Sequence, residues 1–207
     1  MEYLLDIIFP KKCGNCGKLS SAWVCDNCFE NLKYGNIQKI EKGEINYLIS
    51  LFSYGEIRDK MLKFKFNDEP YIYHYFVELI VRKKEITNIL KKSDLIIPVP
   101  MYCLKRWKRG YNQSELIAKG ISKETGIKIN TNILIKNRNT KTQSLLTAEE
   151  RKNNLKDCFG IKNKDLLENK NILLIDDIYT TGTTVEECIM KLNRGNPKEI
   201  NIFVVAR

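Results

Sequence analysis

A segment near the end of the chain with the pattern of a strand, a turn and a helix limits the fold more than any other feature does. Asn171 to Ile175 is an apolar run that ends in Asp176 and Asp177. A hydroxyl-rich turn with one glycine, Gly182, follows, and an amphipathic pattern begins at about Val185. Continuous apolar runs are typical of strands buried on both faces, in sheets that helices cover on both sides. The pattern therefore predicts an α/β protein.

The same alternation of apolar and amphipathic segments runs from Ile45 to the end of the chain. Strands that alternate with helices favour a mostly parallel sheet with helices on both faces. The expected strands are Leu48 to Phe52, Asp94 to Val99, Asn171 to Ile175 and Ile200 to Ala206, and the expected helices are Ile57 to Phe66, Pro70 to about Lys84, Asn112 to Thr125 and Thr184 to Asn193.

Three regions separate along the chain. Residues 1–33 hold paired cysteines and are expected to form a small zinc-ribbon-like module. The polar stretch from Tyr34 to Glu44 is interpreted as a connection, and residues 45–207 are expected to form the α/β domain. A length of 207 residues allows one domain plus a small module, and 43% hydrophobic residues suffice for a sizeable core.

Charge and hydropathy restrict the class of protein. No uncharged stretch approaches the ~20 apolar residues that cross a bilayer. Glu2 and Asp6 stand where a secretory signal would be cationic, so a cytoplasmic protein is expected. The formal net charge of +10 favours an anionic partner, and a solvated basic surface is the alternative.

Four of the seven cysteines form two C-x-x-C pairs separated by eight residues. Each pair can direct two thiolates at one ion, and four thiolates are the tetrahedral set that zinc prefers. Reduced surface thiols and a redox C-x-x-C are the alternatives, and neither explains two pairs at this spacing. The predicted structural zinc ligands are Cys13, Cys16, Cys25 and Cys28. Cys103, Cys158 and Cys188 lack partners at ligand spacing and are interpreted as packing residues.

The start of the helix that follows Gly182 predicts an anion site. Free amides, the helix dipole and threonine hydroxyls would all favour a phosphate there. No lysine follows Gly182, so the turn is not the loop of nucleotide triphosphatases. Asp176 and Asp177 would repel a phosphate unless they bind hydroxyls or a cation. A sugar phosphate fits both parts of the site, because its hydroxyls suit the carboxylates and its phosphate suits the start of the helix. The alternative is that these carboxylates merely end a strand and Thr183 caps a helix.

A basic segment, interpreted as a loop, precedes the helix that begins near Asn112. Its cations, Lys105, Arg106, Lys108 and Arg109, surround Trp107. Such a cluster suits a diphosphate or a nucleic-acid backbone, with the ring free to stack on a base, and a solvated loop is the alternative. Farther along, Arg138 to Ser144 and Arg151 to Asn154 form a polar segment that could close over a bound anion or lie on the surface.

The run from Ile172 to Thr184 resembles the signature of type I phosphoribosyltransferases, which bind 5-phosphoribosyl 1-diphosphate (PRPP). By this resemblance, Asp176 and Asp177 would hold the ribose 2′- and 3′-hydroxyls. Thr180, Thr181, Gly182, Thr183 and Thr184 would cradle the 5′-phosphate. Mg²⁺ would bind together with the sugar diphosphate.

Further blocks narrow the resemblance to the ComF-type competence proteins. The blocks are the N-terminal cysteine module, the proline-framed strand Ile96 to Pro100, the run Arg109 to Gln113, the segment of Gln143 and Arg151 to Asn154, and the Asp176 signature. The resemblance implies a type I phosphoribosyltransferase-like fold behind a zinc finger and the handling of single-stranded DNA in natural transformation, beside other DNA-import proteins. Met101 and Tyr102 depart from the diphosphate loop of amidotransferase relatives, so diphosphate binding by loop amides is a weaker expectation.

Two functions stay open at this point. One is a protein of DNA uptake that binds PRPP and single-stranded DNA through Arg106, Lys108 and Arg109. The other is an active phosphoribosyltransferase with an unidentified acceptor. The sequence indicates no catalytic base, because the one histidine, His74, lies in an aromatic run interpreted as a core-facing helix. Such a transfer needs charge stabilisation more than a base, so the enzyme is not excluded. The high charge and the cysteine module favour the first function.

Overall fold

A six-stranded sheet forms the centre of the protein, in a computed structural model that describes residues 10–35, 37–42, 45–66, 69–140 and 154–207. The strand order is β1-β2-β8-β7-β3-β4. All neighbours run parallel except β1 and β2, which are antiparallel. The bounds are β1 (Ile37–Lys42), β2 (Ile45–Phe52), β3 (Leu95–Pro98), β4 (Lys128–Ile129), β7 (Asn171–Ile178) and β8 (Glu199–Ala206). The predicted mostly parallel sheet is confirmed.

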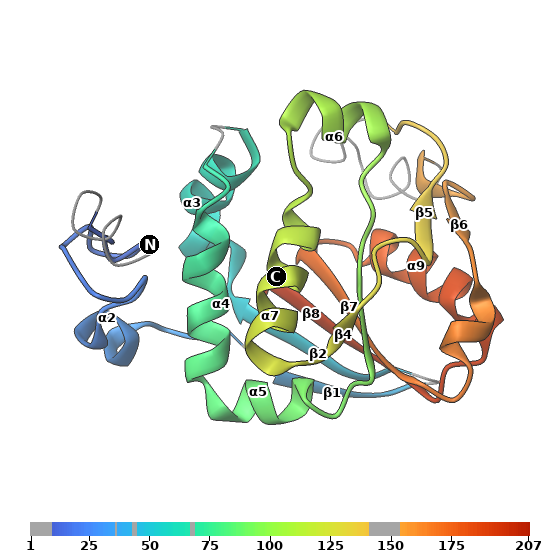
Figure 1. The fold of residues 1–207 in the computed structure, drawn as a ribbon, viewed down its shortest axis with the longest axis horizontal. Helices are drawn as coiled ribbons and strands as arrows, with labels where there is room; N and C mark the ends of the chain where they lie inside the picture. The colour runs from blue at the N-terminus through green and yellow to red at the C-terminus, as the bar shows by residue number, and fades with distance from the viewer. Residues whose placement is uncertain (1–9, 36, 43–44, 67–68, 141–153) are drawn as a thin grey trace.

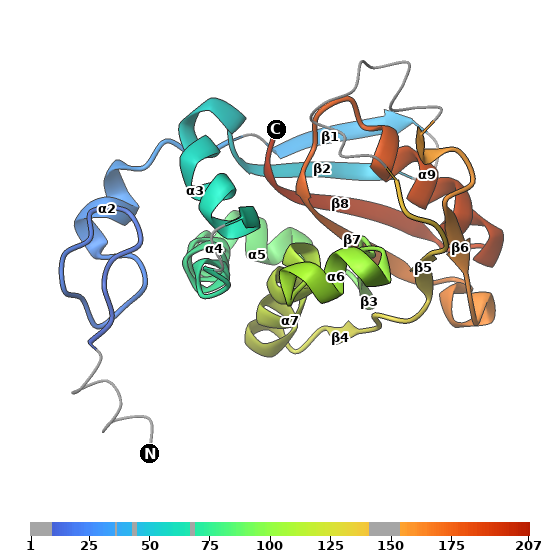
Figure 2. The ribbon, with the colours of Figure 1, turned by 90° about the horizontal axis from the view of Figure 1, so that it is seen from above.

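Helices cover both faces of this sheet (Figures 1 and 2). The side chains of Leu173 and Ile175 on β7 belong to the core under α3, α4, α5 and α7, whereas Ile172 and Leu174 pack with α9. Both faces of β7 are therefore buried, which explains its unbroken apolar run. The helices are α3 (Tyr54–Phe66), α4 (Ile72–Arg82), α5 (Lys84–Leu90), α7 (Gln113–Thr125) and α9 (Thr183–Leu192).

The crossover connections place the candidate site. The chain leaves β3 through α7 to β4 on one side, and it leaves β7 through α9 to β8 on the other. The carboxyl ends of β3 and β7 therefore lie at the point where the strand order reverses. Ligands of open α/β sheets bind in the crevice outside such a switch point. Asp176 and Asp177 lie at this end of β7.

Several elements differ from the sequence-based expectation. The segment interpreted as a basic loop contains the helix α6 (Cys103–Arg109), which Gly110 ends in the left-handed conformation at φ 81°. The residues of α6 are mostly good helix formers, but the high charge of the segment favoured its interpretation as a loop. Part of the expected connection from Tyr34 to Glu44 is the strand β1, whose charged residues are typical of a sheet edge. The expected helix from Pro70 to Lys84 ends at Arg82, and α5 follows.

A small second sheet pairs β5 (Leu134–Lys136) with β6 (Phe159–Ile161) in antiparallel register. Its strands are three residues long and far apart in the sequence, so no periodic pattern predicts them. The turns η2 (Lys164–Leu167) and η3 (Asn193–Gly195) complete the elements used below. No helix within the described ranges has the length and apolar character that a membrane crossing needs.

The cysteine-bearing segment, with the short helix α2 (Asp26–Asn31), packs on the outer side of α4 (Figure 1). Trp23 stacks on His74 with ring centroids 4.7 Å apart, and the Trp23 amide donates to Glu78 at 2.6 Å. Arg82 donates to the Val24 carbonyl at 2.7 Å. The cysteine segment is therefore fixed to the helix layer of the sheet by both stacking and charged hydrogen bonds.

Replacing Arg82 with Met should loosen this attachment. The guanidinium also pairs with Asp26 at 2.5 Å and lies 4.0 Å above the Phe29 ring, and Met keeps only the aliphatic stem. Loss of charged hydrogen bonds should raise amide hydrogen exchange in residues 23–29 by about tenfold, while β7 stays unchanged. Arg58→Met is the matched control, because among the described residues Arg58 pairs with its neighbour Asp59 alone. Equal exchange in the parent and the Arg82 variant would show that Arg82 does not hold the segment.

Candidate functional site

The Asp176 carboxylate lies buried at the carboxyl end of β7. It accepts hydrogen bonds from the Ser114 hydroxyl at 3.1 Å and from the Asp177 amide at 2.8 Å. Ser114 is in the first turn of α7, so this bond ties the start of α7 to the end of β7. The contact fixes one carboxylate of the predicted pair at the switch point.

Asp177 points to a different partner. Its carboxylate pairs with the Lys65 ammonium at 2.8 Å, and both side chains are more than three-quarters buried. Lys65 lies in the last turn of α3, more than a hundred residues away in the sequence. The sequence gives Lys65 no place in the site, because only the fold brings α3 to β7.

The surroundings of Asp176 change its protonation. Burial, followed by the charge of Asp177, raises the pKa of Asp176 from 3.8 to about 7. The Asp177 amide, Lys65 and Ser114 oppose this rise. At neutral pH the site thus holds one carboxylate paired with lysine and a second that shares its proton with solvent. A ligand that brings hydroxyl donors or a cation would favour the ionised form of Asp176.

The turn after the carboxylates forms a small hollow. Residues 178–185 line a cavity of about 20 Å³ directly before and around the start of α9. Gly182 adopts φ +81°, and a Cβ there would collide with the Tyr179 ring, so only glycine suits this position. Thr181 and Thr183 share a hydrogen bond between their hydroxyls at 2.9 Å. Thr180 and Thr181 are exposed, Thr184 is half-buried and Thr183 is buried.

The basic residues of α6 have unequal surroundings. The Lys105 ammonium donates to the Thr140 carbonyl at 2.6 Å, and Arg106 pairs with the buried Glu115 at 2.9 Å. Arg109 donates to Gln113 at 3.0 Å. Lys108 has no side-chain partner among the described residues. Three of the four predicted cations therefore hold α6 in place, and Lys108 beside the 81% exposed Trp107 is the cation left for a ligand.

The run from Arg109 to Gln113 serves as a clamp. Tyr111 and Gln113 both donate to the Phe64 carbonyl, at 2.8 and 2.9 Å, and Arg109 lies 5.3 Å from the Phe66 ring. The Asn112 amide donates to the Val99 carbonyl at 3.0 Å. These bonds fix the end of α3 against the start of α7, so they position Lys65 and Ser114 around the carboxylates. The sequence indicated this run through its motif but not its structural role.

The four paired cysteines come together as predicted. The sulfur atoms of Cys13, Cys16, Cys25 and Cys28 all lie within 4.8 Å of one another. The Asn15 amide donates to the Cys28 sulfur at 3.5 Å, and the Cys25 amide donates to the Cys13 sulfur at 3.4 Å. Amide donors to sulfur are typical of thiolate clusters, so the donor set fits a tetrahedral metal ion.

The pKa values within the cluster diverge. Burial opposes ionisation of Cys13, but the backbone amides of Cys16, Cys25 and Asn15 together lower the pKa of its thiol to about 6. The Asn15 amide favours the Cys28 thiolate, but burial and the other thiols raise the pKa of Cys28 to about 12. Four neighbouring thiolates repel one another, so a cation is the group that would allow all of them to ionise.

The remaining predicted residues have mixed outcomes. Cys158 and Cys188 are buried packing residues as expected, but Cys103 is exposed at the start of α6, so that interpretation was wrong. His74 is half-buried against Trp23, and its predicted packing role is confirmed. Desolvation lowers the pKa of this imidazole. Gln143, Arg151 and most of the polar segment fall in 141–153, outside the described residues.

Comparison with known proteins now decides the family. The family profile "Phosphoribosyl transferase domain" matches residues 86–207. Competence protein F of Haemophilus influenzae is 31% identical over 205 residues, which are 94% of this chain and 90% of that protein. The chain belongs to the ComF family of competence proteins and carries a phosphoribosyltransferase domain.

Other relatives of this ComF chain match smaller parts of it. DNA utilization protein YhgH of Escherichia coli (strain K12) is 31% identical over 121 residues, which are 58% of this chain and about half (52%) of that protein. The solved purine phosphoribosyltransferase of Pyrococcus horikoshii Ot3 covers 62% of this chain and 67% of its own, with 18% identity and a TM-score of 0.38. The N-terminal four-cysteine cluster and Lys65 both lie outside the matched phosphoribosyltransferase domain.

Replacing Asp176 with Asn should remove a pH dependence of stability. The pKa of Asp176 is raised on folding. Its contribution to the free energy of unfolding is therefore full below about pH 4 and is lost as the pH rises through about 7. Between about pH 5 and 8 the parent should lose on the order of 2 kcal/mol of unfolding free energy that the variant keeps. Urea unfolding across this range measures the difference. Asp165→Asn, an exposed change in η2, is the control, and parallel pH profiles for the parent and Asp176→Asn would contradict the shift.

Proposed function

We propose that this ComF-family chain binds PRPP together with Mg²⁺ at residues 176–184 and binds single-stranded DNA next to that site, in DNA uptake. The observation that carries the proposal is the pair Asp176 and Asp177 at the switch point, directly before the threonine turn at the start of α9. The carboxylates can bind the hydroxyls of a phosphorylated sugar, and the amides at the start of the helix can bind its phosphate. The names of the relatives, competence protein and DNA utilization protein, support the cellular role.

Each residue of the site has a task in this proposal. Asp176 and Asp177 accept hydrogen bonds from the ribose 2′- and 3′-hydroxyls. The turn from Thr180 to Thr184 donates hydroxyls and amides to the 5′-phosphate. Mg²⁺ would neutralise the diphosphate and ribose oxygens when it is bound. Ser114 holds Asp176 in orientation, and Lys65 holds the carboxylate of Asp177 through an ion pair before the ligand arrives.

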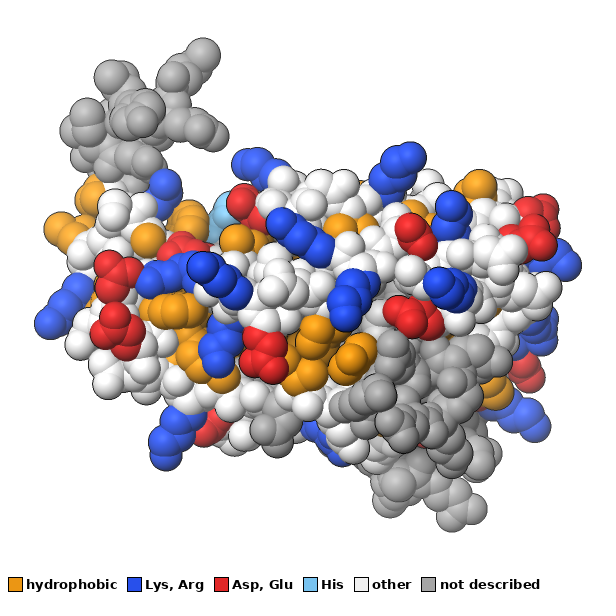
Figure 3. All heavy atoms as spheres, turned by 90° about the horizontal axis from the view of Figure 1, so that it is seen from below, with side chains coloured by type: hydrophobic (Ala, Val, Ile, Leu, Met, Phe, Trp, Pro, Cys, Tyr) orange, Lys and Arg blue, Asp and Glu red, His pale blue; other side chains and the backbone are white. Residues whose placement is uncertain are grey.

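DNA binding rests on the exposed side of α6. Trp107 offers an open ring for stacking, and Lys108 adds a cation beside it. The face seen in Figure 3 shows Lys and Arg side chains interspersed with Asp and Glu, so no continuous basic surface is visible there. The contact with single-stranded DNA is therefore proposed at the exposed ring and cation of α6 and not on this face.

Catalysis is the alternative use of the same site. A nucleophile would attack C1 of the ribose, and the bond from C1 to the diphosphate oxygen would break as diphosphate leaves. His74 packs against Trp23 in the cysteine segment, so it supplies no base to the carboxylates. Diphosphate release across a panel of acceptors separates the two proposals, because a ligand or regulator is not consumed.

Zinc is the cation proposed for the cysteine cluster. It would be held by Cys13, Cys16, Cys25 and Cys28 and would supply folding energy to a segment too short for its own core. Purified protein should contain one zinc ion per chain by elemental analysis. A Cys25→Ser and Cys28→Ser double variant should lose it, whereas Cys103→Ser, outside the cluster, should keep it. Equal zinc in all three proteins would contradict the assignment.

The sugar diphosphate should bind in a way that depends on both carboxylates. Isothermal calorimetry of the Asp176→Asn and Asp177→Asn double variant should show PRPP affinity at least about tenfold weaker in Mg²⁺, because charge-assisted bonds to the ribose are lost. Asp165→Asn with Glu168→Gln removes the same charge at exposed positions of the η2 region and should bind like the parent. Unchanged affinity in the first double variant would show that the carboxylates have another role.

DNA affinity should depend on Trp107 and Lys108 in different ways. Trp107→Ala should cost ~1 to 3 kcal/mol of stacking with little change in salt dependence. Lys108→Ala should lower the slope of log K against log salt by ~0.7, the value for one lost contact to a single strand. Fluorescence anisotropy with an oligonucleotide over a salt series measures both, and Lys84→Ala, an exposed charge on α5, is the control. If neither α6 variant differed from the parent, DNA would bind elsewhere.

A further inference from the structure

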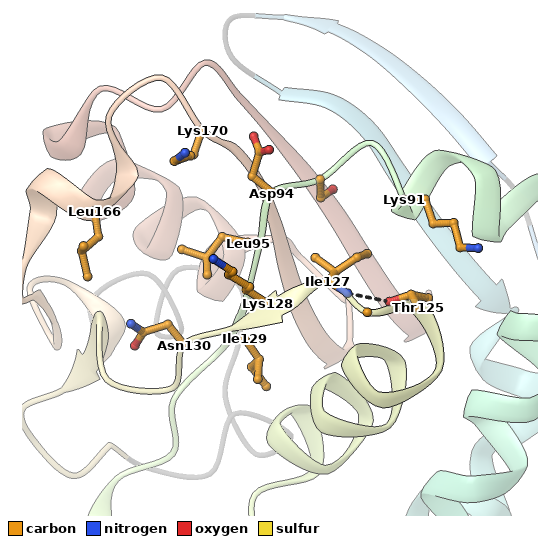
Figure 4. Close-up of a pocket in the computed structure, with 12 residues that line it drawn as sticks. Lys91, Asp94, Leu95, Thr125, Ile127, Lys128, Ile129, Asn130, Leu166 and Lys170 are labelled. Atoms are coloured by element: carbon orange, nitrogen blue, oxygen red, sulfur yellow. Dashed lines mark hydrogen bonds between the residues drawn. The ribbon is translucent and has the colours of Figure 1, made fainter.

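A second hollow lies at the opposite end of the sheet from the carboxylates. It has a volume of about 760 Å³ and sits at the amino ends of β3 and β4 and before β7 (Figure 4). This volume lies within the range of pockets that take small organic ligands. Neither the match to the phosphoribosyltransferase family nor the proposed sites above assigns it a role.

Most of the charged side chains in the lining of this hollow are lysines. Lys91, Lys128 and Lys170 line it, and no carboxylate in the described part of the chain pairs with any of them. Figure 4 shows Lys128 and Lys170 on the side that Leu95 and Asn130 share, whereas Lys91 points away at the far edge. The lysines at positions 65, 119 and 191 have carboxylate partners, whereas the three in this lining keep their charges unneutralised by any described carboxylate.

The acceptors of the lining are already engaged. The Asp94 carboxylate accepts from the Asn171 backbone amide at 2.8 Å, and the side-chain oxygen Oδ1 of Asn130 accepts from the backbone amides of Asn132 and Ile133. The Thr125 hydroxyl lies 3.4 Å from the Ile127 amide, the bond dashed in Figure 4. The lining thus offers free ammonium groups but few free acceptors, which favours an anion over a cation.

The hollow also has apolar surface. Leu95 and Ile129 are half-buried at its floor, and Leu166 on η2 is 51% exposed beside it. The buried Ser93 hydroxyl, on the lining between α5 and β3, has no hydrogen-bond partner. A ligand with an anionic end and a flat ring would use both the lysines and the apolar part of this lining.

The helix ends near the hollow reduce its positive potential without reversing it. The carboxyl ends of α5 and α7 point here, and each carries roughly half a negative charge. Bonds from the Gly126 amide to Ser122 and from the Lys91 amide to Thr87 satisfy part of those carbonyls. Lys128 and Lys170 face the hollow, and Lys91 adds a third positive charge at its edge, so the lysines outnumber the one lining carboxylate, and a net attraction for an anion remains.

We infer that this hollow binds a nucleoside monophosphate, with its phosphate between Lys128 and Lys170 and its base against Leu95 and Leu166. Such a ligand is present as the free nucleotide or at the 5′-phosphorylated end of a DNA strand. The inference does not rest on PRPP binding, because the hollow lies at the amino end of the strands and the carboxylates at the carboxyl end.

Amide chemical-shift mapping of the isotope-labelled full chain tests the inference. Titration with deoxyadenosine monophosphate should move the amides of residues 126–130, 166 and 170 in a saturable way. A Lys128→Met and Lys170→Met variant should bind there about tenfold or more weakly, because two charge-assisted contacts are lost. Lys33→Met with Lys84→Met removes the same charge at exposed sites outside the lining and should titrate like the parent.

The remaining arms identify the ligand and can overturn the inference. A 5′-phosphorylated thymidine oligonucleotide that moves the same amides, when the unphosphorylated strand does not, would identify DNA ends as one source. If the phosphorylated strand leaves these amides unmoved while the mononucleotide moves them, the free nucleotide is the ligand. Shifts confined to residues 180–184, or shifts at 126–130 that the Lys128 and Lys170 variant retains, would overturn it. Inorganic phosphate that binds as tightly as the nucleotide would also overturn the assigned ligand class.

Discussion

The buried carboxyl of Asp176 is the constraint around which the candidate site is arranged. A carboxylate at the end of a central strand is costly to bury unless donors surround it. Ser114 and the Asp177 amide supply those donors, and Lys65 compensates the second carboxylate. Each donor comes from a different segment, so α3, α7 and β7 must meet at this point. The bonds from Tyr111 and Gln113 to the Phe64 carbonyl hold the end of α3 next to the same carboxylates.

The cysteine cluster connects to this arrangement through the helices. Its segment is attached to α4 through Trp23 and Arg82, and α4 packs against α7, which carries Ser114. The Lys60 ammonium of α3 also donates to the Gly14 carbonyl within the cluster. A metal that orders the cysteine segment would therefore stabilise the layer that holds Ser114 and Lys65. The cluster lies outside the matched domain but contacts the helices on which the site depends.

Residues that are close in the sequence were the predictable part of the site. The strand, the two carboxylates, the threonine turn and the paired cysteines follow from local patterns and spacing. Lys65 and Ser114 were not assigned to the site, because their contacts to Asp177 and Asp176 depend on how α3 and α7 pack on the sheet. The basic segment shows the converse, since its composition indicated a ligand-binding loop whereas internal bonds engage Arg106 and Arg109. Short strands such as β4 and β5 carry too few residues for a periodic signal.

A crystal structure of the chain grown with PRPP and Mg²⁺ tests the central claim most directly. The account predicts the 5′-phosphate at the amides of residues 181–184, the ribose hydroxyls at Asp176 and Asp177, and the Ser114 bond to Asp176 preserved. A sugar diphosphate bound elsewhere, with the Lys65 to Asp177 ion pair intact and the threonine turn empty, would contradict it.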